Sequence, residues 1–468
     1  MKKFLYTILM VSALFFAACS SPTSSSGSDP APTQNQQQGQ NNQNEQNQPK
    51  YSKLQLKTGS SIRSILRELN PAEDAVAFLP SQTAPAETVT VKYLDLLEED
   101  VPVWFDTSTK KLYFYADAVT TENATKKLKL NKNSNYMFQI LKKLETLNIS
   151  CFDFSEVEDF SYMFAFCESL KTIDSSKIKT EKAKYMEGMF EYCTQLESLD
   201  VSAFDTSNVY NMSKMFYECS SLTNLDVSGF NTAKVKDMSM MFDGCVALTT
   251  LDVSGFNTKN VTAIFSMFAE CSSLTTLDVS HFDTSKVTNM ASMFSNCLSL
   301  TSLDVSNFNT SNVKNMLNMF ARCEKVPVID VSHFDTKNCE KMTGMFYKCQ
   351  TITSLNLLSF DTSNVTDMDM MFCDCTGLTE LDLSNFDTSK VTDMFLMFDL
   401  CSALTKIYAS EKFDTTLAAQ NKFHTLFFEC EKLVGGSGTK YNYAHYDIDY
   451  AHIDGGSDNP GYFTAKSE

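Results

Sequence analysis

The sequence predicts an α/β repeat protein: a solenoid of about 12 coils of 26 residues, each with one short strand and one short helix, closed by a cap at each end. The pair Met-Phe recurs at intervals of 26 residues from Met137-Phe138 to Met397-Phe398. A cysteine stands three residues after the phenylalanine in almost every copy, first as Cys167. A single copy cannot bury its apolar face alone, so we expect neighbouring copies to stack on one another.

One repeat, beginning at Leu222, illustrates the expected coil. Residues 222–228 end in an alternation of apolar and polar side chains, which is typical of a half-buried strand with Leu225 and Val227 facing inward. The polar pair Asn231-Thr232 predicts a turn and a helix N-cap. A helix with one apolar stripe is then expected, and the stripe consists of Val235, Met238, Met241, Phe242 and Cys245.

The first 50 residues read as targeting and tether segments. Residues 1–18 contain two lysines, an apolar stretch and small residues before Cys19, as an export signal does. The small residues directly before Cys19 resemble a lipobox, which implies that Cys19 carries diacylglycerol with acyl chains such as palmitate. The alternative is a plain secretory signal in which Cys19 has no role. Residues 19–50, rich in Ser, Gln and Asn, are expected to form a disordered tether.

The segments that flank the repeats differ from them in pattern. Residues 51–130 contain a predicted helix in SSIRSILREL and a predicted hairpin in VPVWFDTSTKKLYFYA, and we expect this region to be an N-terminal cap. Residues 131–430 hold the repeats. Residues 431–468 are rich in tyrosine and glycine and are predicted to cover the last coil, although an aromatic cluster of this kind could also stack on sugars.

The full repeat pattern, seen as LTTLDVSHFDTSKVTNMASMFSNC from Leu274 to Cys297, resembles the leucine-rich repeats of BspA-type bacterial surface proteins. The resemblance covers about residues 137 to 430. It implies a lipid-anchored protein in the bacterial cell envelope, exposed on the outer-membrane surface. It also implies adhesion, with host extracellular matrix proteins, host cell-surface proteins or other bacterial cells as partners.

Composition argues against several classes of function. The net charge is −18, so the cationic surface that nucleic acids and anionic lipids require is missing, and we expect membrane attachment through the N-terminal lipid alone. Only 5 His residues occur, which leaves little material for general-base chemistry. No Ser-hydrolase, zinc-protease or phosphate-binding motif is found. We therefore expect no enzyme activity, no catalytic residue, no cofactor and no metal site. His281 and His333 are expected to be exposed bystanders.

Two columns of acidic residues recur in the repeats. In the first column some copies have Asp and others have Asn. The position therefore needs a side-chain hydrogen-bond acceptor but not a charge, as in an Asx-turn. Its members are Asp205, Asn231, Asn257, Asp283, Asn309, Asp335, Asp361 and Asp387.

The second column, termed here the aspartate ladder, lies between the inward Leu and Val and should point outward. Stacked carboxylates about 4.8 Å apart repel one another, so the ladder must be solvated, hydrogen-bonded by Ser and Thr, or bridged by cations. The alternatives are a hydrogen-bonded ladder, a partner-binding stripe and calcium sites, and no calcium-loop motif supports the last. The ladder comprises Asp174 and the candidate binding residues Asp200, Asp226, Asp252, Asp278, Asp304, Asp330 and Asp382.

Fifteen cysteines in an exported protein first suggest disulfides. Eleven of them occupy one repeated column, where stacking holds their Cβ atoms farther apart than a disulfide allows, so we expect buried free thiols. Pairing of the cysteines outside that column, Cys151, Cys339 and Cys373, stays open. The functional expectation is a surface adhesin that binds without chemistry. The alternative is a periplasm-facing lipoprotein that scaffolds envelope proteins or captures glycans.

Overall fold

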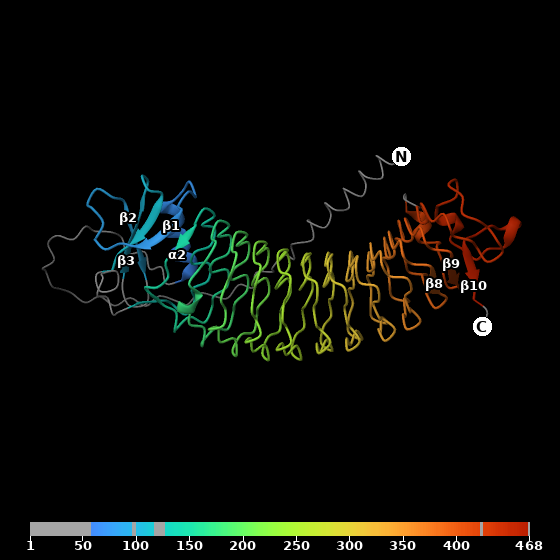
Figure 1. The fold of residues 1–468 in the computed structure, drawn as a ribbon, viewed down its shortest axis with the longest axis horizontal. Helices are drawn as coiled ribbons and strands as arrows, with labels where there is room; N and C mark the ends of the chain where they lie inside the picture. Colours follow the sequence, from blue (N-terminus) through green and yellow to red (C-terminus); the bar gives the residue numbers. More distant parts are fainter. Residues whose placement is uncertain (1–57, 96–99, 117–126, 422–424, 467–468) are drawn as a thin grey trace, which may run out of the picture. The chain divides into compact units, whose positions relative to one another are not determined.

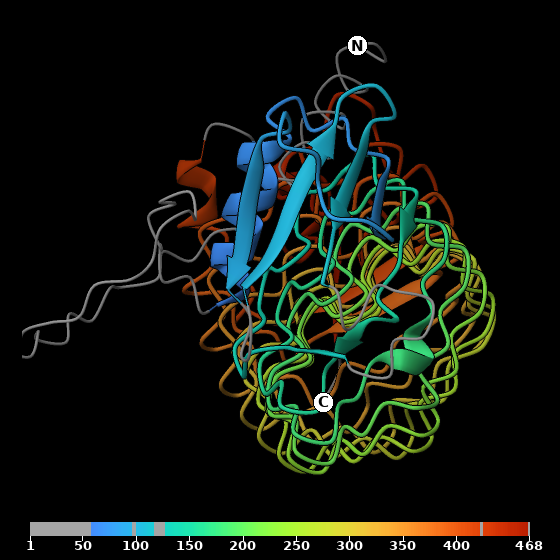
Figure 2. The ribbon, with the colours of Figure 1, turned by 90° about the vertical axis from the view of Figure 1, so that its left-hand side faces the viewer.

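The computed structural model describes residues 58–95, 100–116, 127–421 and 425–466. The predicted signal, Cys19 and the tether lie outside these ranges. The chain between the caps winds through successive coils that lie side by side in sequence order (Figure 1). Figure 2 looks along the array from its N-terminal end, and the outlines of successive coils follow one another. The repeat architecture predicted from the sequence is confirmed.

The N-terminal region begins with the one α-helix among the described residues, α2 (Gly59–Leu69). Its apolar residues Ile62, Ile65, Leu66 and Leu69 recur every three or four positions, and all are buried. The helix ends at Asn70, whose backbone N–H still donates to the Leu66 carbonyl. The helix thus presents one apolar face to the core.

A five-stranded sheet completes this region, in the order β2-β3-β4-β1-β6. The strands β2 (Val91–Asp95), β3 (Asp100–Asp106) and β4 (Lys111–Phe114) are antiparallel, and β1 (Ala77–Pro80) runs parallel to β4. Strand β6 (Thr146–Leu147) pairs in parallel with β1 and belongs to the first coil. Pairing of β5 (Leu128–Lys129) with β7 (Phe152–Asp153) adds a second contact, so the core of the sheet continues into the repeats.

Aromatic stacking runs through the interior of the array. The phenylalanine of the Met-Phe pair stacks on its counterpart in the next coil, for example Phe242 on Phe268 with ring centroids 5.8 Å apart and Phe268 on Phe294 at 6.0 Å. These rings are fully buried. The cysteine column lies beside them, and Cys271 Sγ donates to the Phe242 carbonyl at 3.2 Å. All described cysteines are free, so the buried-thiol prediction for the column is confirmed.

The short helix predicted in each coil is wrong. Two residues per coil have positive φ, such as Lys214 at 57° and Glu218 at 59°, and this conformation interrupts a helix. Alternate backbone N–H groups donate to the next coil instead of to the residue four positions earlier. Around Phe216 these bonds are Met212 N to Asp237 O at 3.0 Å, Lys214 N to Ser239 O at 2.9 Å and Phe216 N to Met241 O at 3.0 Å. The intervening N–H groups close tight turns, as in Met215 N to Met212 O at 3.2 Å.

The predicted strand is reduced to a single bridge residue in four coils, and at residues 302–306, 328–332 and 354–358 neither a bridge nor a strand is present. Thr250 and Thr276 form such a parallel bridge between neighbouring coils. Regular strands appear at this position as β6, and toward the C-terminus as β8 (Glu380–Leu383) and β9 (Lys406–Ala409). The coils are therefore built from turns and short extended segments, and the predicted α/β alternation does not hold within them. Short 3₁₀ helices occur at Ser175–Lys177, Ala418–Gln420, Ile448–Tyr450 and Gly456–Asp458.

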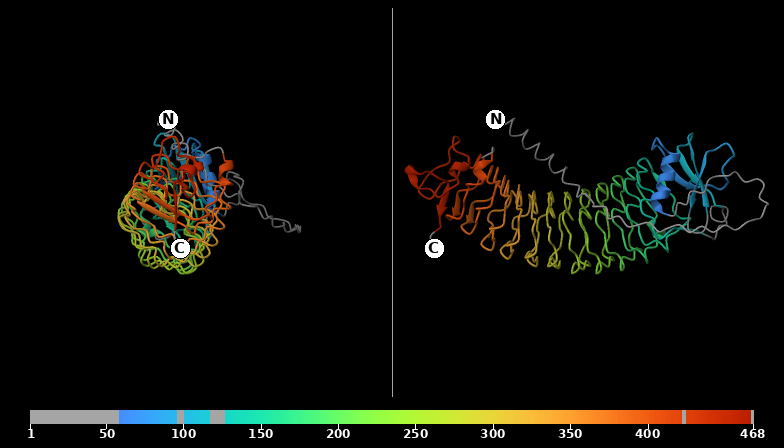
Figure 3. Two further views of the ribbon diagram at one scale, coloured as in Figure 1. Left: turned by 90° about the vertical axis from the view of Figure 1, so that its right-hand side faces the viewer. Right: turned by 180° about the vertical axis from the view of Figure 1, so that it is seen from behind.

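The C-terminal segment closes the last coil. Strand β10 (Phe463–Ala465) pairs in parallel with β9, which extends that sheet by one strand (Figure 3). The buried Asp454 side chain holds the surrounding loops: it accepts from Ser437 N at 2.8 Å, Thr439 N at 3.0 Å and Gly456 N at 2.9 Å. No described helix of this chain is both long enough and apolar enough to cross a bilayer.

Candidate functional site

One surface of the array repeats the same side-chain arrangement from coil to coil. We call it the strand face and define it by residues 198–202, 224–228, 250–254, 276–280, 302–306, 328–332, 354–358 and 380–384. Within each segment the side chains alternate: Leu225 and Val227 are buried, whereas Asn224, Asp226 and Ser228 are exposed. The inward and outward positions predicted from the sequence are confirmed.

Every aspartate of the ladder is held by the residue two positions later. Ser228 donates to Asp226 Oδ1 from its backbone N–H at 3.0 Å and from its hydroxyl at 2.6 Å. Ser280 repeats both bonds to Asp278, at 3.0 and 2.7 Å. The Ser228 hydroxyl, and then its amide, lower the pKa of Asp226. The ladder is thus hydrogen-bonded and ionised at neutral pH, and the serine bonds use Oδ1 and not Oδ2.

The two ends of the ladder differ from its middle. Lys177 Nζ lies 3.6 Å from Asp174 at the first end, and Lys466, directly after β10, contacts Asp382 at the other. The members between them, termed here the central stripe, form no ion pair with any described lysine, arginine or histidine. The central stripe consists of Asp200, Asp226, Asp252, Asp278, Asp304 and Asp330.

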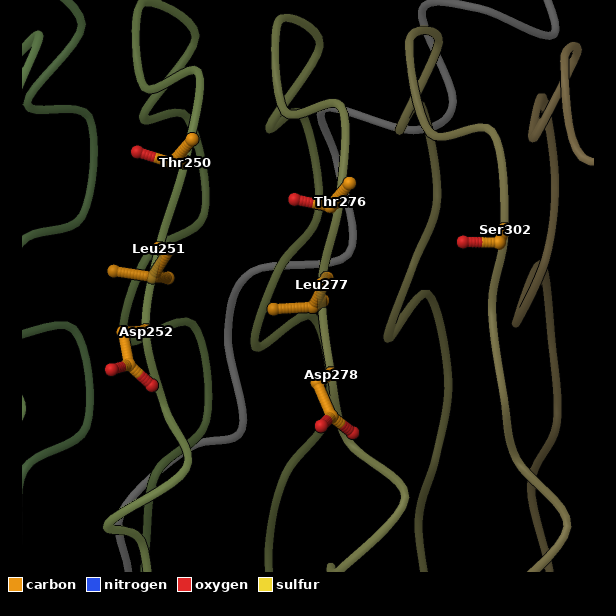
Figure 4. A pocket seen from close by; sticks show the side chains of 7 residues that line it. All are labelled: Thr250, Leu251, Asp252, Thr276, Leu277, Asp278 and Ser302. Atoms are coloured by element: carbon orange, nitrogen blue, oxygen red, sulfur yellow. The ribbon is translucent and has the colours of Figure 1, made fainter.

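Shallow hollows lie on the strand face between neighbouring coils. In the first, Thr250, Thr276 and Ser302 point the same way on successive coils, and the carboxylates of Asp252 and Asp278 lie in a parallel row (Figure 4). Leu251 and Leu277 are part of its lining. The second hollow continues the row past Asp304 to Pro327 and Val328. Both are open depressions, and such a surface suits an extended ligand better than an enclosed small molecule.

Two aliphatic side chains on this face are unusually exposed. Val328 is 68% exposed and Leu358 is 57% exposed. Each occupies a position that is polar in the neighbouring coils, namely Ser302 for Val328 and Ser332 for Leu358. These are single apolar residues in two different coils and do not form a contiguous patch.

A second set of acidic residues lies on a different surface, which we call the turn face and define by residues 185–192, 211–218, 237–244, 263–270, 367–374 and 393–400. Burial, reinforced by Glu270 and Glu218, raises the pKa of Asp243 to about 8. Burial also raises the pKa of Glu191 to about 7. Asp399 is 1% exposed, and its Oδ2 has no hydrogen-bond partner among the described residues.

The remaining predicted positions have structural roles. The alternating acid and amide column forms Asx-turns, as predicted: Asp205 Oδ1 accepts from Ser207 N at 2.9 Å and Asn231 Oδ1 from Ala233 N at 3.1 Å. Burial raises the pKa of the Cys219 thiol to about 12, so the column thiols are inert. Within the described ranges, no three His, Cys, Asp or Glu side chains are grouped so that they could hold a metal ion.

Sequence reasoning missed several features of the strand face. The exposed Val328 and Leu358 could have been found as departures from the column consensus. Lys466 gave no signal, because its contact with Asp382 depends on the C-terminal strand folding back onto the array. His281, expected to be a bystander, lies close enough to the ladder to help lower the pKa of Asp252 and Asp278.

Comparison with known proteins gives one result. Neither the curated proteins nor the solved structures include a significant match to this chain. A family model described as a Mycoplasma protein of unknown function, DUF285, matches in five overlapping stretches, at residues 110–202, 132–250, 193–277, 247–352 and 327–436. The BspA-type resemblance stays a prediction. Because the matched stretches together run from residue 110 to residue 436, well over half of the sequence, the chain belongs to the DUF285 family.

Proposed function

We propose that this protein is a lipid-anchored surface protein whose strand face binds host extracellular proteins, host cell-surface proteins or other bacterial cells. In this proposal the array is a leucine-rich-repeat solenoid of the BspA type, Cys19 carries the lipid, and no catalysis takes place. The observation that carries the proposal is the strand face itself, which presents the same exposed Asp, Ser and Thr side chains over successive coils.

Repetition is the physical basis of the proposed binding. A shallow face offers a partner many similar contacts, each of them weak, because exposed polar groups gain little when they exchange water for a ligand. Several contacts along one array and several arrays on one cell raise the effective affinity without a deep pocket. An anchored repeat protein can act as an adhesin on this basis.

Protease treatment of intact cells tests the location. We expect added protease to release the region from residue 58 onward while a periplasmic control protein survives. Protection of both proteins would contradict surface display and would favour the periplasm-facing scaffold or glycan-capturing lipoprotein.

The anchor has its own test. In a Cys19→Ala variant, the protein should leave the membrane fraction and appear in the soluble fraction, because the acyl chains that hold it would be absent. A Ser21→Ala variant is the matched control and should stay in the membrane fraction. Retention of the Cys19→Ala variant would show that Cys19 is not the attachment site.

A further inference from the structure

We infer that the central stripe of the strand face docks an extended, lysine-rich segment of a partner protein, with the lysine ammonium groups on the aspartate Oδ2 atoms. This inference rests on the proposed function and names the partner chemistry of the same face. Three features of the molecule carry it: the aspartates without a lysine or arginine partner, a lysine contact within the chain, and the lining of the hollows.

The first step is the uneven neutralisation of the ladder. The chain supplies a lysine to Asp174 at one end and to Asp382 at the other, but no described lysine or arginine forms an ion pair with the six aspartates between them. A row of like charges about 4.8 Å apart carries a repulsion of about 1 kcal/mol per neighbouring pair even in water. A partner that brings positive charges relieves this repulsion, whereas an acidic partner increases it.

The second step is the contact made by the C-terminal end of the chain. Strand β10 lies in parallel beside β9, and the residue that follows it, Lys466, reaches Asp382. The lysine side chain therefore reaches past β9 to the aspartate at one end of the ladder, which lies in β8. Asp382 accepts from Ser384 in the same way that Asp278 accepts from Ser280, so the central aspartates present equivalent Oδ2 atoms.

The third step is the lining of the two hollows. Leu277 and Leu303 lie at the base of the hollows and are each 6% exposed, whereas Pro327 and Val328 stand exposed at the end of the second hollow. A lysine side chain has a four-carbon stem and a charged tip, and it packs its stem on apolar groups while the tip reaches a carboxylate. The exposed Pro327 and Val328 near Asp304 offer such an apolar surface at one end of the hollows.

The length of the central stripe sets the number of residues that the bound segment needs. Six carboxylates at about 4.8 Å spacing cover roughly 24 Å. An extended chain covers this distance with about seven or eight residues. We therefore choose fluorescein-labelled octalysine as the probe and octaglutamate as its control, and measure fluorescence anisotropy with the full-length protein.

The decisive variant replaces Asp226, Asp252, Asp278 and Asp304 by Asn. The chain itself carries Asn356 at this column, where its Oδ1 accepts from Leu358 N at 3.3 Å, so the substitution preserves the turn. The matched control replaces Asp205, Asp283, Asp335 and Asp361 by Asn. It removes the same charge from the Asx-turn column, where Asn231 and Asn257 already stand.

We expect octalysine to bind the unchanged protein, more tightly at low salt, and octaglutamate not to bind. The stripe variant should bind octalysine at least about tenfold more weakly, since it loses several carboxylate contacts, while the control variant should stay within about twofold. Equal weakening in both variants would mean that only net charge matters and would overturn the proposal, as would the absence of octalysine binding. If protease releases the domain from intact cells but octalysine does not bind, surface display stands and lysine recognition fails.

Discussion

The strand face and the turn face place the same kind of side chain in opposite environments. On the strand face, Asp226 is exposed and accepts two hydrogen bonds from Ser228, which lower its pKa. On the turn face, burial and two neighbouring acids raise the pKa of Asp243 to about 8. Only 17 residues separate the two along the chain. Position within the coil, and not residue type, therefore decides whether an acid is charged at neutral pH.

This difference bears on the proposed binding, because the two faces do not present charge to solvent in the same way. The strand face keeps its charges in water, where they can attract a ligand without a large desolvation cost. On the turn face, burial keeps some carboxyl groups partly neutral at neutral pH. Their protonation therefore affects the stability of the fold. If the strand face binds a partner as proposed, stability and recognition lie on two different surfaces of one repeat.

The largest expected effect comes from removing a buried acid on the turn face. The pKa of Asp243 is raised from 3.8 to about 8, so its contribution to stability is complete below about pH 4 and is lost as pH rises through 8. In an Asp243→Asn variant the free energy of unfolding at pH 8 should rise by about 2 to 5 kcal/mol. Urea denaturation at pH 5 and pH 8 measures this change.

The strand face supplies the control for that variant. Asp226→Asn should leave the slope of stability between pH 5 and pH 8 unchanged, because the pKa of Asp226 is lowered and its pH dependence lies below 3.8. If both variants changed the slope equally, the contrast between the two faces would be lost.

At Asp454, in the C-terminal segment, burial and hydrogen bonding act on the pKa in opposite directions. Burial favours the neutral acid, yet hydrogen bonds from Thr439, Gly456 and Ser437 together lower the pKa of Asp454 to about 2. In an Asp454→Asn variant the free energy of unfolding should fall by about 2 to 3 kcal/mol, because hydrogen bonds to a charged group usually contribute about that much. Because the pKa is lowered, this stabilisation is present above about pH 4 and lost as pH falls toward 2.

Thermal unfolding at pH 7 measures the effect, with Asp458→Asn, on the same cap, as the matched control. An Asp454→Asn variant as stable as the control would show that burial alone sets the behaviour of these acids, contrary to the comparison of the two faces.

Gly244 makes room for one acid of the turn face, Glu218. Its φ is +76°, and an added Cβ would lie 2.8 Å from Glu218 Cδ, so the missing side chain makes room for that carboxyl group. Gly244→Ala should destabilise the protein by about 1 to 3 kcal/mol, because it combines a left-handed conformation with a collision. Gly229, which has nothing within 4 Å of an added Cβ, provides the matched Ala control. Urea denaturation measures the free energy of unfolding of both variants. Equal values would show that the side chain of Glu218 does not need the space at Gly244.

The sequence predicts the strand face better than the turn face, for a physical reason. Columns that recur in each copy, such as the inward Leu225 and Val227, report a constraint shared by all coils. The turn-face positions vary: Asp243 has Ala269 and Tyr217 at the same place in neighbouring coils. Their burial depends on side chains 26 residues away, and no single repeat contains that information.

The wrong helix prediction has a related cause. The spacing of Val235, Met238 and Phe242 fits one face of a helix, but it also fits a series of turns whose alternate N–H groups bond to the next coil. Apolar spacing records which side chains are buried and not where the backbone bonds go. Where the backbone hydrogen bonds go is decided by the contacts between coils, which override the local pattern.

The smallest expected effect comes from removing the serine hydroxyl that lowers the pKa of Asp226. Ser228→Ala removes the hydroxyl bond to Asp226 Oδ1 at 2.6 Å and leaves the amide bond at 3.0 Å in place. The pKa of Asp226 should rise toward its ordinary value, since the hydroxyl is the largest cause of its lowering, and the fold should be unaffected. Carboxyl NMR titration follows Asp226 and, as an internal reference, Asp278 with its own Ser280 bond. A pKa of Asp226 that did not move would mean that exposure alone keeps the strand face charged, and that serine contributes only to the turn.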